Sequence, residues 1–158
     1  MKAEYINPFL KSLKRTFDTM LNCKVKRETL RLKEGNTASF PISGIVGLSG
    51  NAVGTVVLSL SNQVAMKAAE TMLMTEVKEV DDSVIDAVGE LANMIAGAAK
   101  AELEKYNMKI SLPSVITGEN HQIRFPSNVS PVSVPFTTDF GPIVLEVGLA
   151  PVAEPVGA

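Results

Sequence analysis

The sequence has little of the chemistry on which most catalytic centres depend. Its 158 residues include one cysteine, Cys23, one histidine, His121, and no tryptophan. A single cysteine excludes an internal disulfide bond, and one cysteine with one distant histidine argues against a zinc site and against a Cys–His nucleophilic pair. We therefore expect no metal site in this chain and interpret His121 as a surface residue at a strand edge.

Long apolar runs and an excess of one charge are also missing. No stretch of 18 or more apolar residues occurs, so we expect no transmembrane helix. Lys11, Lys14 and Arg15 interrupt the region where a signal peptide would need its apolar core. A net charge of −2 gives no reason to expect nucleic acid as a partner. These absences predict a cytoplasmic protein.

Length and composition favour one globular domain. The hydrophobic fraction is 46% and the charged fraction 20%, and no linker divides the chain. We predict a single domain over residues 1–158, with a disordered tail over residues 151–158. A basic run near the first helix is interpreted as a solvated strand face and its flank; it consists of Lys24, Lys26, Arg27, Arg31 and Lys33.

The first half of the chain predicts two helices separated by a hairpin. Asn7 suits a helix cap and Pro8 the first helical position, while Ser61 can cap the second helix. Gly50-Asn51 suits a tight turn between two β-rich runs. The expected elements are a helix over 8–21, a strand over 25–32, strands over 39–49 and 52–59, and a helix from Ser61 to about Met74 with Leu73 facing inward.

The second half predicts one long helix followed by strands. Asp81 and Asp82 suit the positive end of a helix that continues to about Asn107. The expected strands cover 111–118, 121–125, 132–138 and 143–149, with Pro113 and Pro135 marking edges or bulges. Together the elements predict an α+β fold, one antiparallel β-sheet with long α-helices packed on one face. Strand pairs on both sides of the long helix suggest an internal pseudo-duplication.

The long helix presents a polar stripe about 80° wide at about 100° per residue. Such a stripe is ordinary on an amphipathic helix and usually only faces water. Here, however, Asp86 stands four residues before Glu90 and repels it, and Asn93 is a poor helix former at mid-helix. Gly89 and Gly97 each weaken the helix by up to about 1 kcal/mol relative to alanine. Several local rules broken on one patch indicate a functional surface that another backbone can approach closely.

A carboxylate beside a carboxamide suits the positioning of water. An amide both donates and accepts hydrogen bonds, so it can hold a water in line with a phosphoryl group, and a carboxylate can pair with a lysine of a partner. The chain has no phosphate-binding glycine loop and no nucleophile elbow. Any phosphoryl group and metal must then come from the partner.

The segment Glu90-Leu-Ala-Asn93-Met-Ile-Ala-Gly97-Ala-Ala-Lys100 resembles the long-helix motif of the CheC/CheX/FliY phosphatases of bacterial chemotaxis. Asp86 fits the family pattern of Asp or Ser, three residues, Glu, two residues, Asn. The resemblance covers nearly the whole chain. Because the chain carries a single such motif, it resembles the CheX-like branch of the family. One spacing differs, because the family pattern places a proline further beyond the asparagine than the 19 residues that separate Asn93 from Pro113.

The resemblance implies a phosphatase that hydrolyses the aspartyl phosphate of a CheY-like response regulator. Glu90 would dock the regulator by pairing with its active-site lysine, and Asn93 would orient the attacking water. Mg²⁺ would be bound by the partner receiver domain, and a homodimer is expected. The residues expected to contact the partner are Asp86, Gly89, Met94, Gly97 and Lys100.

Two other functions stay open at this point. The same helix face would also suit a non-catalytic, CheC-like binding module for a receiver or a flagellar-switch protein. An apolar pocket between sheet and helices would instead indicate a small-molecule sensor.

Overall fold

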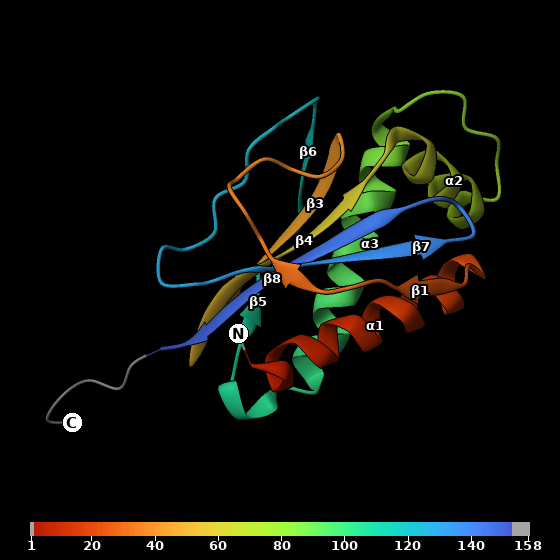
Figure 1. Cartoon of the computed structure of the whole chain (residues 1–158). Helices are drawn as coiled ribbons and strands as arrows, with labels where there is room; N and C mark the ends of the chain where they lie inside the picture. The colour runs from red at the N-terminus through yellow and green to blue at the C-terminus, as the bar shows by residue number, and fades with distance from the viewer. Residues whose placement is uncertain (1, 153–158) are drawn as a thin grey trace, which may run out of the picture.

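In a computed structural model that describes residues 2–152, three helices pack on one face of an antiparallel sheet, and long connections cross the other face (Figure 1). The helices are α1 (Ala3–Leu21), α2 (Asn62–Leu73), α3 (Asp82–Ala101) and the short 3-10 helix η1 (Glu104–Tyr106). The strands are β1 (Val25–Arg27), β2 (Arg31–Leu32), β3 (Ile42–Ser49), β4 (Ala52–Leu60), β5 (Lys109–Ile110), β6 (Ser114–Thr117), β7 (Val132–Thr138) and β8 (Ile143–Pro151). The order is β1-β7-β8-β4-β3-β5, with β2 beside β7 and β6 beside β3. The predicted α+β class is confirmed.

The predicted cap at Ser61 and the predicted hairpin are present, whereas Asn7 lies inside α1 and caps no helix. Ser61 Oγ accepts a hydrogen bond from Val64 N–H at 3.1 Å, and Asp81 Oδ1 accepts bonds from the first turn of α3. The β3–β4 hairpin turns at Gly50, whose φ of 146° lies in the region that favours glycine. A Cβ at Gly50 would also lie 2.5 Å from the carbonyl oxygen of Asn107, so only glycine fits there.

Two helix boundaries differ from the predictions. Helix α1 begins at Ala3 rather than at Pro8, because the additional turn buries Tyr5 and Ile6 and this burial outweighs the one backbone hydrogen bond that an internal proline removes. Helix α3 ends at Ala101 rather than near Asn107. The helix stops there because the chain turns and buries the side chain of Leu103, which is 3% exposed, in the core.

Several strand predictions were wrong in detail. Residues 121–125 form no strand and make only an isolated bridge, Thr37 with Gln122. The predicted strand over 25–32 is divided into β1 and β2, and within the predicted strand over 111–118 only Ser114–Thr117 forms a strand, β6. Leu73 is 47% exposed rather than inward-facing. Of the predicted tail, Pro151 lies in β8, and residues 153–158 lie outside the described residues.

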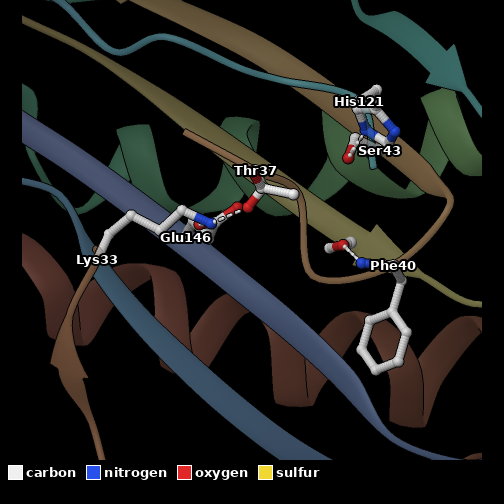
Figure 2. Close-up of polar contacts among 7 residues, drawn as sticks. Lys33, Thr37, Phe40, Ser43, His121 and Glu146 are labelled. Carbon is white, nitrogen blue, oxygen red and sulfur yellow. Dashed lines mark hydrogen bonds and ion pairs between the residues drawn. The ribbon is translucent and has the colours of Figure 1, made fainter. Parts of the chain in front are cut away.

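The face of the sheet opposite the helices carries polar side chains beneath the long connections (Figure 2). Lys33, predicted to be solvated, is paired with Glu146, and their side chains are 8% and 1% exposed. His121, predicted to be a surface residue, is half-buried: its Nε2 lies 2.7 Å from Ser43 Oγ and its Nδ1 lies 2.8 Å from the Gly118 carbonyl oxygen. Both corrections have one cause, the long-range packing of these connections on the sheet.

Helix α3 is held close to the sheet by a glycine and to α1 by a buried hydrogen bond. A Cβ at Gly44 of β3 would lie 3.0 Å from Ala92 Cβ and 3.1 Å from the Val88 carbonyl oxygen. Ser12 Oγ of α1 donates to the Ile95 carbonyl oxygen at 2.8 Å. The position of α3, and of everything on its outer face, is therefore fixed by direct contact with both neighbours.

Gly44→Ala is expected to lower the free energy of unfolding by about 1–3 kcal/mol, because the methyl group overpacks against the backbone of α3. Urea denaturation measures the loss. Gly47→Ala is the matched control on the same strand, since its Cβ would meet only ordinary contacts at 3.5 Å or more. Equal stability of the two variants would contradict the close approach of helix and strand.

Candidate functional site

The predicted polar stripe lies on the outer side of α3. Asp86 and Glu90 are exposed, and Asn93, Gly97 and Lys100 are half-buried. Met94, beside the stripe, is half-buried. The carboxylates thus occupy the first half of the helix, and the carboxamide follows them one turn later.

The side chains of Glu90 and Asn93 have no protein partner within residues 2–152. Neither makes a side-chain hydrogen bond or an ion pair there. A carboxylate and a carboxamide offer several acceptor positions and two donors, all still available to a second molecule. The like-charge neighbour Asp86 is also unpaired within this range.

The segment 110–115 at the sheet edge runs alongside this face of α3. A Cβ at Gly89 would lie 3.4 Å from Val115 Cγ2 and 3.7 Å from Pro113 Cβ, and one at Gly97 would lie 3.9 Å from Ile110 Cδ1. Gly89 is buried, and the space beside this glycine is filled by side chains of the same protein, those of Pro113 and Val115. A direct contact of Gly89 with a partner remains a prediction.

Pro113 lies against the motif helix although its spacing from Asn93 is short. The proline ring packs over Gly89, the residue before Glu90. The shorter connection therefore still brings a proline beside the turn of α3 that carries Glu90. Segment 110–115 was not among the predicted site residues; Pro113, which was expected to mark a strand edge or a bulge, was the one signal in the sequence that pointed to it.

Of two surface cavities, one borders this face and the other lies away from it. One of about 420 Å³ borders the second half of the stripe and is lined by Gly97, Lys100, Ala101, Glu104, Asn107 and Met108. A larger one of about 570 Å³, lined by Lys11, Lys14, Arg15, Asp18, Cys23, Lys24 and Val25, contains none of the predicted site residues. Five of its seven lining residues carry a charge.

The described residues contain no group of three or more His, Cys, Asp or Glu side chains that could hold a metal ion. Within the same range, none of the helices is long and apolar enough to cross a membrane.

Comparison with known proteins decides the family. Residues 42–137, more than half of the chain, match the family described as chemotaxis phosphatase CheX. The chain belongs to the CheX family. The predicted CheX-like branch and a phosphatase activity are thereby confirmed.

Individual relatives agree with this assignment. A protein of Thermotoga maritima named CheY-P phosphatase CheX is 25% identical over 127 residues, which cover 78% of this chain and 82% of that protein. The crystal structure of a CheC-like superfamily protein from Shewanella sp. PV-4 matches with a TM-score of 0.86 and 31% identity over 95% of this chain and 99% of that chain. The crystal structure of the CheX-CheY-BeF3-Mg²⁺ complex from Borrelia burgdorferi matches with a TM-score of 0.79 and 25% identity, over 92% and 97%.

Proposed function

We propose that this CheX-family protein hydrolyses the aspartyl phosphate of a CheY-like receiver domain. The name of the Thermotoga relative gives that substrate, and the Borrelia complex joins a CheX to a CheY that carries a phosphoryl mimic and Mg²⁺. The partner would supply the phosphoryl group and Mg²⁺. This chain would supply binding and the placement of water.

The proposed roles divide between two side chains on α3. Glu90 is exposed and pairs with the active-site lysine of the receiver, which fixes the orientation of the complex. Asn93 is half-buried against the sheet edge and holds the attacking water in line with the phosphorus–oxygen bond that breaks. No covalent intermediate on this chain is required, because correct placement alone lowers the barrier.

The observation that carries the proposal is the state of Asn93. It stands in mid-helix between two glycines, both of which face segment 110–115, and its side chain makes no hydrogen bond within residues 2–152. Its side chain is half-buried while its amide remains free. A group that must orient one water needs both properties.

The test is the loss of phosphate from receivers of the same genome that have been phosphorylated with acetyl phosphate. Purified protein should accelerate the loss for at least one receiver when Mg²⁺ is present. Binding of a receiver without any acceleration would instead favour the CheC-like binding module. A cytoplasmic location and a homodimer also remain predictions, the second of which sedimentation of the purified protein checks.

Glu90→Gln is expected to raise KM for the phosphorylated receiver roughly 10- to 100-fold, because a charge-assisted hydrogen bond across the interface is lost. The turnover number should change much less, since Asn93 is intact. Initial rates over a range of receiver concentrations measure both constants. Glu34→Gln, at an exposed residue on the connection between β2 and β3, is the matched control and should leave KM unchanged. A fall in turnover with unaltered KM would contradict the docking role.

A further inference from the structure

The sheet edge beside α3 carries one residue more than the strand with which it pairs. Ile110 pairs with Leu48, and Ser114 pairs with Ile45. Between these pairs β3 has two residues, whereas the edge has three, residues 111–113. This is the arrangement of a β-bulge, which bends an edge strand and changes the direction of a side chain.

The fold fixes the backbone of this bulge. Ser111 N–H donates to the Gly47 carbonyl oxygen at 2.9 Å, and Gly47 N–H donates to Ser111 Oγ at 2.9 Å. Ser111 Oγ in turn donates to the Leu112 carbonyl oxygen at 2.9 Å. Pro113 packs against α3 on the other side. The side chain of Leu112 between them is nevertheless 89% exposed, so an apolar group is held in solvent by a rigid backbone.

Leu112 lies beside the turn of α3 that carries Asn93. Its neighbours Ile110 and Pro113 contact the helix one turn after and one turn before Asn93, on the same side of the helix. The bulge therefore passes next to the carboxamide. Single exposed leucines on a surface need no explanation, but one held rigidly beside a free polar pair does.

We propose that Leu112 is a docking residue for the phosphorylated receiver, which it contacts through an apolar surface beside the phosphorylated aspartate. The inference rests on the proposed function and names a further contact of the same site. A standard interface buries about 800 Å² on each partner, equivalent to a disc about 16 Å in radius. A receiver centred on Asn93 must therefore cover the adjoining bulge. Leu112 then supplies apolar burial at the centre, where binding energy concentrates, while Glu90 and Asn93 supply the polar contacts.

Leu112→Ser tests this assignment through separate measurements of KM and turnover. KM for the phosphorylated receiver should rise roughly 10-fold, because the apolar burial of one leucine is lost on binding. The turnover number at saturating receiver should change by less than about twofold, since the substitution removes no polar group. Leu112→Met should restore KM. Leu32→Ser, on the 64% exposed Leu32 at the opposite sheet edge, is the matched control and should change neither constant.

A second measurement separates this inference from the proposed function. Titration of each variant with a receiver that carries beryllofluoride and Mg²⁺ gives Kd independently of turnover. An unchanged KM and Kd for Leu112→Ser, with active wild-type protein, would overturn the docking role and leave the phosphatase assignment intact. A wild-type protein that binds the receiver but hydrolyses nothing would overturn the phosphatase assignment. In that case a roughly 10-fold weaker Kd for Leu112→Ser still supports the docking role, and absence of receiver binding overturns it.

Discussion

Asn93→Ala is expected to lower the turnover of a phosphorylated receiver on the order of 100-fold and to leave KM nearly unchanged. An interaction that acts only in the transition state affects turnover and not ground-state binding. Loss of a positioning group or of one transition-state hydrogen-bond donor typically reduces turnover by about 10²- to 10³-fold. Single-turnover decay of the phosphorylated receiver at saturating phosphatase measures the effect without interference from product release.

The same substitution should not harm folding. Asn93 makes no side-chain hydrogen bond within residues 2–152, and alanine is the better helix former, so the free energy of unfolding should stay equal or rise slightly. Asn7→Ala is the matched control, because Asn7 is an exposed asparagine in α1. Asn93→Asp places a negative charge against the phosphoryl group and should be at least as inactive. If Asn93→Ala keeps turnover within about twofold of an active wild type, the carboxamide does not place the water.

The shared face of Glu90 and Asn93 was predictable because helical periodicity depends only on local sequence. Their spacing determines that both project from one side of any helix that contains them. Helical periodicity does not predict which segment packs against that side. The packing of Pro113 on Gly89 depends on the pairing of a distant edge strand with β3, and no local pattern specifies that pairing.

Lys33 shows the same limit on the other face of the sheet. In the sequence it ends a run of basic residues, and such runs are usually solvated. Its partner Glu146 lies in β8, where it alternates with apolar residues of the core face. Only the folded connection across the sheet brings the two together, so burial and pairing of both charges followed from long-range packing rather than from composition.

Lys33→Met is expected to lower the free energy of unfolding by about 3–5 kcal/mol, because it leaves the Glu146 carboxylate buried without its counter-charge. The carboxylate is 1% exposed, and its Oε2 accepts no hydrogen bond from the described residues, so the lysine ammonium is its principal compensation. The substitution also removes the 2.7 Å hydrogen bond from Lys33 Nζ to the Thr37 carbonyl oxygen. Urea denaturation of the purified protein measures the loss.

Two further variants identify the buried charge as the cause. Glu146→Leu in the Lys33→Met background should recover most of the stability, because two apolar groups replace the pair. Lys11→Met breaks the 2.7 Å pair with Glu102, whose side chains are 60% and 41% exposed, and should cost less than about 1 kcal/mol. Turnover of folded Lys33→Met protein should match wild type, since the pair lies on the face of the sheet opposite α3. A double variant no more stable than Lys33→Met would show that the hydrogen bond to Thr37, rather than the charge pair, holds this connection.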